Sequence, residues 1–278
     1  MKRRDVKKIG FVDYYLSEWH ANNYPAWIEE ACQKQGLDYK PAYAWAELDV
    51  SPVDGVTTEQ WCARYGATKC DTLRELCERS DVIVILAPSN PETHLRYAKT
   101  VLTYGKRTYI DKTFAPDLAT ALEIFDIAKR NNTQFFSTSA LRYADELASV
   151  ACPRAITVTG GGSNLPEYSI HLAEMVVKKM GVGADSVTAD LRGDQWFFTV
   201  RYSDGRVATI IYAPKLPYTI YMSSPEKQEW KQVKSAFFGG LISDMLNFFR
   251  SGAISFDVAE TLEVARLREM MLRAATKN

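Results

Sequence analysis

The sequence lacks an excess of charge and lacks any long apolar run. Lysine plus arginine and aspartate plus glutamate both number 34, which gives a formal net charge of zero. Without a positive surplus, nothing predicts a nucleic-acid partner or an anionic membrane surface. No apolar run approaches the ~18 residues that span a bilayer, and the basic start of the chain leads into a strand pattern instead of a signal peptide. We therefore expect a soluble, cytoplasmic protein.

Cysteine and histidine are also scarce. The five cysteines are odd in number and form no C-x-x-C pair. A disulfide framework or a structural zinc site is therefore not expected, whereas small buried thiols are. The cysteines are Cys32, Cys62, Cys70, Cys77 and Cys152. Two of the histidines, His20 and His94, lie in the first half of the chain and His171 lies in the second. No metal site is predicted from this distribution, because zinc requires three or four ligands together.

The first half of the chain alternates strand and helix patterns. Its clearest element is the unbroken apolar run 82–86, which is typical of a strand buried on both faces of a parallel sheet. The patterns predict strands at 6–13, 37–43, 81–87, 107–110 and 134–137, and helices at 21–35, 58–65, 72–79, 91–105 and 118–130. This alternation predicts a Rossmann-like α/β domain with a doubly wound parallel sheet over residues 1–145.

The second half has more strands and fewer helices between them. Strands are predicted at 154–159, 186–191, 195–202, 206–213 and 218–223, and helices at 167–180, 237–250 and 258–275. Together they predict an α+β domain with a mostly antiparallel sheet over residues 146–278, and the C-terminal helix is a candidate to pack back on the first domain. One helix covers the apolar face of such a sheet incompletely, so we expect a homodimer or a larger homo-oligomer.

Short motifs along the chain resemble those of the glucose–fructose oxidoreductase/inositol dehydrogenase (Gfo/Idh/MocA) family. No single motif is specific, but their order and spacing together are. The motifs are Ala87-Pro88-Ser89-Asn90 with His94, Tyr104-Gly105-Lys106, Asp111-Lys112-Thr113-Phe114-Ala115, Arg142-Tyr143, and Glu167 with His171 and Glu174. The resemblance implies an oxidoreductase that uses NAD or NADP and acts on a sugar, a polyol or a related hydroxy compound.

Lys112, His171 and Glu167 are the candidate catalytic residues. Lys112 follows a predicted parallel strand, at the edge where such sheets bind ligands. Glu167 and His171 are four residues apart and so share one face of a helix, near an N-terminus that favours a neutral imidazole. The resemblance implies that Lys112 hydrogen-bonds the reacting hydroxyl, that His171 takes or returns its proton, and that Glu167, where the family has Asp, orients His171 or contacts the substrate. A surface lysine and a structural histidine are the alternatives.

A dinucleotide normally requires a glycine-rich turn after the first strand, and this sequence has none there. The stretch 12–20 contains no glycine, while Asp13 and Glu18 place negative charge where a diphosphate would lie. The second predicted strand also ends without an acidic residue for the ribose, with Glu47 as a distant substitute. The resemblance would place the cofactor against Asp13, Tyr14, Tyr15, Pro88, Ser89, Asn90, Asp111 and Lys112.

Three functions therefore remain open. The leading hypothesis is the NAD(P)-dependent oxidoreductase. The second is a cofactor-free relative that serves as a carbohydrate-binding, regulatory or partner subunit, because a fold alone does not decide the activity. The third is non-redox proton chemistry on a carbohydrate, such as epimerisation or elimination, carried out by the same Lys, Glu and His side chains.

Overall fold

The chain divides into two units that are not continuous in sequence. The computed structural model describes residues 6–148 and 153–277. Unit 1 consists of Met1–Ser137 with Leu241–Ser255, and unit 2 consists of Thr138–Gly240 with Phe256–Asn278. This division differs from the expected one at residues 145 and 146. Unit 2 begins earlier, and part of the second half of the chain belongs to unit 1.

The segment that belongs to unit 1 contains most of helix α7 (Phe237–Ser251). In this helix, the ring centroid of Phe248 lies 5.0 Å from that of Phe136. Arg107 donates hydrogen bonds to the carbonyl oxygens of Phe249 (2.8 Å) and Arg250 (3.1 Å). These contacts explain why α7 joins unit 1. The C-terminal helix α8 (Val258–Ala275) belongs to unit 2, and its packing on the first unit stays a prediction.

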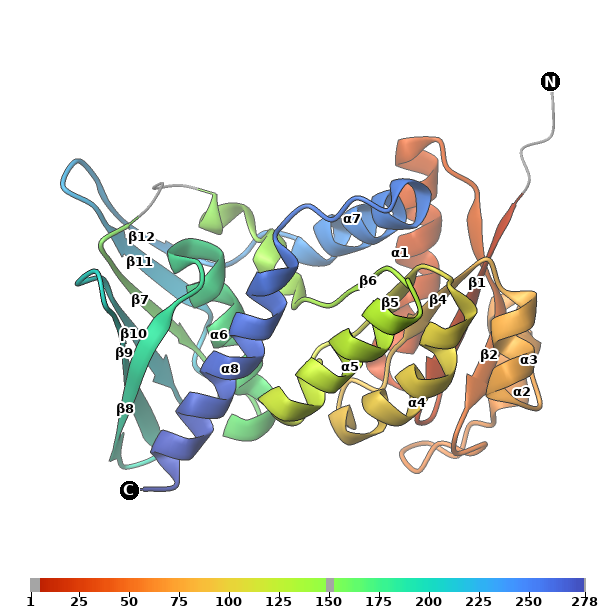
Figure 1. Cartoon of the computed structure of the whole chain (residues 1–278), viewed down its shortest axis with the longest axis horizontal. Helices are drawn as coiled ribbons and strands as arrows, with labels where there is room; N and C mark the ends of the chain where they lie inside the picture. The colour runs from red at the N-terminus through yellow and green to blue at the C-terminus, as the bar shows by residue number, and fades with distance from the viewer. Residues whose placement is uncertain (1–5, 149–152, 278) are drawn as a thin grey trace. The chain divides into compact units, whose positions relative to one another are not determined.

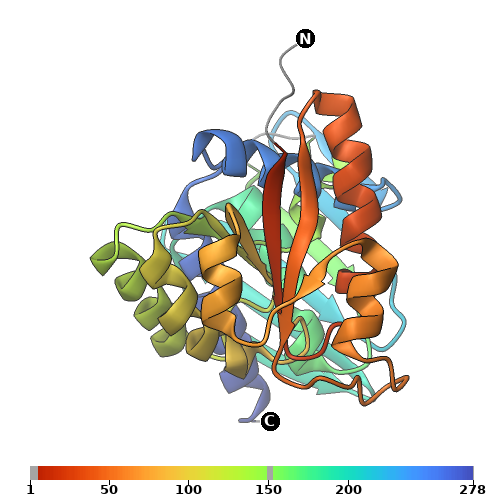
Figure 2. The same ribbon diagram turned by 90° about the vertical axis from the view of Figure 1, so that its right-hand side faces the viewer.

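Unit 1 is a parallel α/β unit, as predicted. Its elements are β1 (Lys7–Asp13), α1 (Trp19–Gln35), β2 (Tyr39–Ala46), α2 (Thr58–Tyr65), β3 (Thr68–Lys69), α3 (Leu73–Arg79), β4 (Val82–Ile85), η1 (Pro91–Thr93), α4 (His94–Val101), η2 (Leu102–Tyr104), β5 (Thr108–Ile110), α5 (Leu118–Arg130) and β6 (Phe135–Phe136). The six strands are parallel and lie in the order β3-β2-β1-β4-β5-β6. Figure 2 shows helices on both faces of this sheet. This is the doubly wound order whose strand sequence reverses between β1 and β4, and ligands bind at such a point.

Two local features of unit 1 differ from the sequence prediction. The short strand β3 was not predicted, because two residues give no periodic pattern. The helix expected over 91–105 consists of an α-helix between two 3₁₀ turns, which are common at helix ends. The glycine of β1, Gly10, serves helix packing, since a Cβ atom there would lie 2.3 Å from Ser80 Oγ and 2.6 Å from a methyl of Leu76. Gly10 lies within β1, and the turn that follows β1 contains no glycine.

Unit 2 contains the second sheet. Its further elements are η3 (Ala140–Tyr143), η4 (Asp145–Leu147), β7 (Ala155–Gly160), α6 (Leu165–Met180), β8 (Ala184–Arg192), β9 (Gln195–Tyr202), β10 (Val207–Tyr212), β11 (Thr219–Ser223) and β12 (Gln228–Gln232). The strand order is β12-β11-β7-β10-β9-β8, with four antiparallel pairs and one parallel pair between β7 and β10. The sheet is thus mostly antiparallel, as predicted. The one parallel pair, β7 with β10, lies within this mostly antiparallel sheet. Strand β12 was not predicted.

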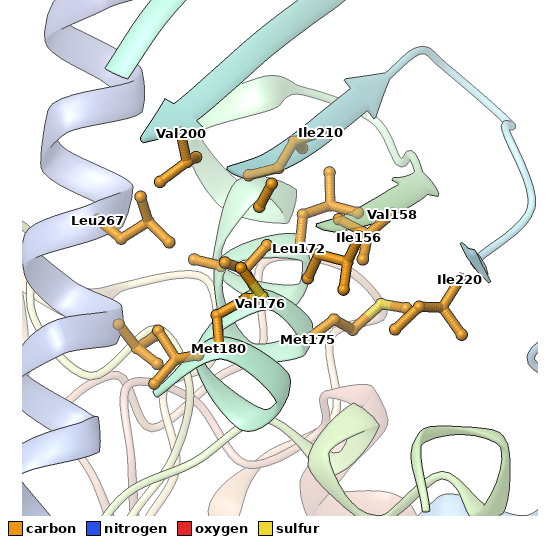
Figure 3. Close-up of a cluster of buried hydrophobic side chains, with 14 of the residues drawn as sticks. Ile156, Val158, Leu172, Met175, Val176, Met180, Val200, Ile210, Ile220 and Leu267 are labelled. Atoms are coloured by element: carbon orange, nitrogen blue, oxygen red, sulfur yellow. The ribbon is translucent and has the colours of Figure 1, made fainter. Parts of the chain in front are cut away.

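The core of unit 2 lies between this sheet and two helices. Figure 1 shows α6 and α8 on the same side of the strands, and Figure 3 shows Leu172 and Val176 of α6 and Leu267 of α8 facing Val158 and Val200 of the sheet. All five side chains are fully buried. Burial alternates along β10, so the opposite face of that strand is half-buried. Two helices therefore cover the inner face, where the sequence predicted one.

Four cysteines lie within the described residues, and all four are buried free thiols, as expected. Burial raises the pKa of Cys62 and of Cys77 to about 12. Cys152 falls outside the described residues. Within residues 6–148 and 153–277, no helix has both the length and the apolar character that a membrane crossing requires.

We predict that Leu267→Ala strongly destabilises the protein. Leu267 is fully buried, and removing a buried leucine side chain costs about 2–5 kcal/mol because a cavity remains. The matched control is Leu191→Ala, since Leu191 is 39% exposed and its loss costs under about 1 kcal/mol. Urea unfolding measures both changes. Equal losses in the free energy of unfolding for the two variants would contradict the place of Leu267 in the core.

Candidate functional site

The carboxyl edge of the unit 1 sheet holds a buried polar cluster. Asp13 ends β1, Ala87 follows β4 and Asp111 follows β5, and these three strands are neighbours. The Asp13 carboxylate accepts hydrogen bonds from the N–H groups of Tyr14 (2.7 Å) and Ala87 (3.0 Å). Ala87 has a positive φ of 55°, which is uncommon for a residue with a side chain. Asp13 therefore fixes the turn that leaves β4.

Asp111 is the most heavily bonded member of this cluster. It is fully buried, and its carboxylate contacts His20 Nδ1 and accepts hydrogen bonds from the hydroxyls of Tyr109 (2.8 Å) and Tyr24 (3.5 Å). Burial alone would raise the pKa of Asp111, but the charge and hydrogen bond of His20, with smaller effects of Lys112 and Tyr109, lower it. Asp111 is therefore a buried carboxylate that stays ionised.

Asp13 has the opposite electrostatic character. Burial and the nearby Glu18 carboxylate raise the pKa of Asp13 well above its ordinary value, against its two backbone hydrogen bonds. Its second oxygen, Oδ2, is buried and has no hydrogen-bond partner among the described residues. The two buried carboxyl groups of this edge are thus pushed in opposite directions, Asp13 toward the protonated form and Asp111 toward the ionised form.

Glu18 caps the helix that follows. Its side chain accepts hydrogen bonds from the backbone N–H groups of His20 (2.7 Å) and Ala21, which lie in the first turn of α1. Acidic residues are stabilising at this position because the helix dipole is positive there. The first N–H groups of α1 are therefore bonded to the chain's own carboxylate.

The other residues predicted to contact a cofactor lie around this edge. Lys112 is half-buried directly after Asp111, and the Lys112–Thr113 peptide bond is cis. Tyr14 and Tyr15 are half-buried, with ring centroids 6.2 Å apart. The loop after β4 contains a buried Pro88, an exposed Ser89 and a half-buried Asn90. Unit 1 thus brings the predicted residues to one sheet edge, while their role in binding stays a prediction.

His94 has a packing role in unit 1. It is fully buried, and its ring nitrogens lie 3.0 Å from Phe114 O and 2.6 Å from Leu86 O. Burial lowers its pKa, although both carbonyl groups act in the other direction. His94 therefore joins the end of β4 to the loop after Lys112.

In unit 2, His171 lies on α6 beside a serine. Its Nδ1 is 2.7 Å from the hydroxyl oxygen of Ser139, which precedes η3. Helix α6 begins at Leu165, two residues before the predicted start, so His171 is in its second turn, where the dipole effect is weaker than the sequence predicted. The rings of Tyr168 and Tyr218 lie 5.9 and 6.0 Å from the imidazole ring. His171 is half-buried among these groups.

Glu167 lies in the first turn of α6 and takes part in its cap. Asn164 accepts a hydrogen bond from the Glu167 N–H (2.8 Å), and its side-chain amide donates to the Glu167 carboxylate (3.1 Å). This reciprocal pair stabilises the helix start. The predicted action of Glu167 on His171 or on a substrate stays a prediction.

The three consecutive glycines before α6 allow tyrosine rings to approach the backbone. A Cβ atom at Gly160 or Gly162 would lie 2.3 Å from the Tyr218 ring or 2.1 Å from the Tyr168 ring. The Tyr218 hydroxyl donates to Gly161 O (3.2 Å). A side chain on this loop would therefore displace the two rings that flank His171.

The sequence analysis missed Ser139 and underestimated Glu174. Glu174, named in the sequence only as part of a motif, is buried, and it accepts hydrogen bonds from Arg142 Nε and from Ser139 N–H (3.0 Å). Arg142 also pairs with Glu260 on α8, at 2.6 Å. The Arg142-Tyr143 motif was a signal for this network, since a buried arginine requires a carboxylate.

Lys112 belongs to unit 1 and His171 to unit 2. Their convergence on one substrate hydroxyl therefore stays a prediction. Among residues 6–148 and 153–277, no group of three or more His, Cys, Asp or Glu side chains is arranged to hold a metal ion.

Known proteins with similar sequences agree with the motifs. Residues 50–139 match the Gfo/Idh/MocA model, described as an oxidoreductase family with an NAD-binding Rossmann fold. This segment is therefore similar to the Gfo/Idh/MocA oxidoreductase family. A stretch of 57 residues is 37% identical to the uncharacterized oxidoreductase YhhX of Escherichia coli (strain K12). That match spans 20% of this chain and only 16% of the length of the relative.

Solved structures of similar fold extend over nearly the whole chain. UDP-N-acetylglucosamine 3-dehydrogenase GnnA of Acidithiobacillus ferrooxidans has a TM-score of 0.76 at 13% identity, covering 96% of this chain and 97% of that one. Myo-inositol 2-dehydrogenase of Lactobacillus plantarum has a TM-score of 0.76 at 13% identity, covering 98% of each chain. GenD2 from gentamicin A biosynthesis, solved in complex with NAD, has a TM-score of 0.78 at 12% identity, covering 99% of this chain and 96% of GenD2. At such identities the likeness shows the fold alone.

The family is NAD-binding, but the residues at the unit 1 edge do not fit a dinucleotide held in the usual way. The turn between β1 and α1 lacks glycine, and Glu18 takes N–H groups that a diphosphate would use. Glu47 follows β2 directly, close to the position that binds a ribose, but its carboxylate contacts Arg96 and accepts a hydrogen bond from the Tyr97 hydroxyl (2.7 Å). The N–H groups expected to bind a diphosphate and the carboxylate expected to bind a ribose are thus already hydrogen-bonded within the chain.

We predict that Asp13→Asn stabilises the protein at high pH. The raised pKa means that the folded state prefers protonated Asp13, so the stability from this group is full at about pH 4 and is lost as the pH rises through the folded pKa. Asparagine does not titrate and keeps an oxygen for the N–H groups of Tyr14 and Ala87. We expect a melting temperature about 2–4 °C above that of wild type at pH 8, the shift that ~1 kcal/mol produces, and a smaller difference at pH 5.

The control for this prediction is Asp71→Asn, because Asp71 is exposed. Its effect on the melting temperature should be small at both pH values. A difference between Asp13→Asn and wild type that grows as the pH falls would show that Asp13 is ionised in the folded protein.

Proposed function

We propose that this chain binds a sugar, a polyol or a related hydroxy compound and acts as an oxidoreductase on it, with His171 moving the proton of one hydroxyl group. The observation that carries the proposal is the 2.7 Å contact between His171 Nδ1 and Ser139 Oγ. The match of residues 50–139 to the oxidoreductase family model supports the reaction class, and the resemblance of the Glu167–His171 motif supports the choice of His171.

The serine hydroxyl can serve His171 in both directions of proton transfer. When Nδ1–H donates to Ser139 Oγ, the other ring nitrogen has a lone pair and can accept a proton from an alcohol. After taking that proton the ring is an imidazolium whose Nδ1–H still donates to Ser139 Oγ, so the other nitrogen can return the proton and leave a neutral imidazole. Ser139 Oγ also accepts a hydrogen bond from Leu141 N–H (3.3 Å), which limits its rotation. Ser139 is therefore a positioning residue that sets the tautomer of His171.

The surroundings of His171 suit a compound with both hydroxyl groups and apolar C–H faces. Tyr168 and Tyr218 present ring surfaces beside the imidazole, and Gly161 fixes the Tyr218 hydroxyl. Small-molecule sites combine apolar walls with a few oriented polar groups in this way. The names of the structural relatives, an inositol dehydrogenase and a nucleotide-sugar dehydrogenase, support this substrate class.

The family motifs assign two further residues to the substrate. We propose that Lys112 hydrogen-bonds the reacting hydroxyl, and that Glu167 orients His171 or contacts the substrate. When bound, NAD or NADP would supply the hydride acceptor in such a reaction. This chain's own contribution is to orient the hydroxyl and to take its proton.

A second candidate is favoured by the capped helix of unit 1. Because Glu18 bonds the first N–H groups of α1, the chain is also a candidate for a cofactor-free relative that binds a carbohydrate as a regulatory or partner subunit. Non-redox proton chemistry at His171 is compatible with the same contacts. The oxidoreductase and the cofactor-free relative would bind the same hydroxy compound. Only the oxidoreductase would oxidise it with NAD or NADP.

We predict that His171→Gln lowers turnover at least about 100-fold, the usual contribution of a general acid or base, while the Kd for the hydroxy compound changes little. The assay follows nicotinamide absorbance with NAD⁺ or NADP⁺ and candidate substrates such as myo-inositol and UDP-N-acetylglucosamine. Calorimetry measures binding. Lys178→Ala is the control, since Lys178 is exposed on the same helix. Unchanged turnover in His171→Gln would remove His171 from the mechanism.

Ser139→Ala provides a test of the positioning role. We expect a loss of turnover smaller than that of His171→Gln, because the imidazole remains. The chain has three histidines, so the ring ¹⁵N signals of His171 can be assigned by comparison with His171→Gln. They should show a changed tautomer balance in Ser139→Ala. Unaltered ring signals would contradict the role of Ser139.

We also propose that the chain self-associates and that it is a cytoplasmic protein, as its composition predicted. The outer face of the second sheet includes half-buried Phe197 and Ile211, which pair across β9 and β10, and an exposed Trp230 on β12. Apolar side chains on an exposed face are typical of interaction surfaces.

We predict a homodimer or larger homo-oligomer at micromolar concentration, measured by light scattering. Trp230→Glu should shift the mass toward that of a monomer because it adds charge to the outer face. Trp19→Glu is the control, because Trp19 is 55% exposed in the other unit. A monomeric wild type would refute this prediction.

A further inference from the structure

The first turn of α1 is where a doubly wound sheet holds phosphate groups. Backbone N–H groups point out of that turn, and the helix dipole is positive there. Helix α1 follows β1, one of the two strands at which the strand order of unit 1 reverses. The position is therefore the anion site that this strand order provides.

In this chain the position is filled by Glu18. One carboxylate oxygen lies 2.7 Å from His20 N, and the other contacts Ala21 N. Two N–H groups are thus bonded to an anionic side chain with two oxygens, as they would be to a phosphate. The carboxylate belongs to the residue that precedes the helix, so it needs no ligand to be in place.

Several contacts hold Glu18 where it lies. Its carbonyl oxygen accepts a hydrogen bond from Asn22 N (2.9 Å), and its own N–H donates to Leu16 O (2.9 Å). The flanking Ser17 donates to Asp54 (2.7 Å), and the side chain of His20 contacts buried Asp111. The cap is therefore part of a bonded turn and not a loose surface side chain.

The charge around this turn opposes an anionic ligand. Asp13, Glu18 and Asp111 are close enough for their carboxyl groups to influence one another electrostatically. Facing them are His20, bonded to Asp111, and Lys112, which directly follows it. A diphosphate carries two negative charges, and like charges in a partly enclosed site repel strongly.

We propose that Glu18 takes the place of the diphosphate in unit 1, so that this chain excludes NAD and NADP from the site that its strand order provides. The inference deepens the second candidate of the proposed function, the cofactor-free relative, and stands against the first, because the oxidoreductase requires a bound nicotinamide. It rests on the match of residues 50–139 to the family model, which is described as NAD-binding. The binding of a hydroxy compound beside His171 does not depend on it.

The test compares wild type, Glu18→Ala and the control Glu29→Ala on the same helix, where Glu29 is exposed. Nicotinamide fluorescence follows titration with NADH and with NADPH, and thermal melting follows addition of inorganic pyrophosphate. We expect no saturable binding of either nucleotide to wild type or control up to about 1 mM, and no pyrophosphate-dependent rise in melting temperature. Glu18→Ala should bind pyrophosphate and bind NADH at least about tenfold more tightly than wild type.

Two outcomes overturn the proposal. One is saturable binding of NADH or NADPH to wild type with a Kd below about 1 mM. The other is a folded Glu18→Ala variant that binds pyrophosphate no better than wild type. Where loss of the cap prevents folding, Glu18→Gln serves instead, because it keeps an oxygen for the helix N–H groups and removes the charge. A gain in pyrophosphate binding by Glu18→Gln supports the proposal, and no gain overturns it.

Different measurements test the exclusion of NAD and NADP and the role of His171. Tight NADH binding to wild type would overturn the exclusion and leave the role of His171 intact. Turnover that is unaffected in His171→Gln would remove that role and leave the exclusion intact.

Discussion

The ionised carboxylate of Asp111 is the constraint on which the edge of unit 1 depends. A buried charge is costly unless it is paired and hydrogen-bonded, and Asp111 meets this requirement with His20 and two tyrosine hydroxyls. The pair ties the first turn of α1 to the end of β5. The position of Glu18, two residues before His20, follows from this attachment. The contact between His20 and Asp111 thus accompanies a turn after β1 that is polar, hydrogen-bonded and without glycine.

Helices α1 and α6 have different N-terminal caps. Helix α1 begins with Glu18 bonded to its N–H groups, whereas α6 begins with Asn164, a neutral cap that faces Glu167. The half-buried His171 then lies one turn further along α6, beside Ser139 and two tyrosine rings. Both units share their fold with the solved structures, and in each unit the polar groups near the helix start are hydrogen-bonded within the chain.

Periodicity predicted most of the fold. The apolar run of β4 and the alternation of strands and helices gave the parallel sheet, because burial on both faces leaves a clear pattern. Strands β3 and β12 were missed, since the first has two residues and the second is mostly polar. The loss of the glycine-rich turn was visible in the sequence, but the capping role of Glu18 was not, because it depends on the angle at which α1 leaves β1. Ser139 was missed for a similar reason: it is 32 residues from His171, and only the fold brings them together.

Unit 1 is formed by two separate segments of the chain, and this affects when it can fold during synthesis. The sheet ends at β6, yet the rings of Phe136 and Tyr39 and the side chain of Arg107 meet partners on α7, far downstream. During synthesis these surfaces stay uncovered until the chain has been extended through Ser255. The first unit to emerge from the ribosome therefore cannot finish folding until most of the second has been translated.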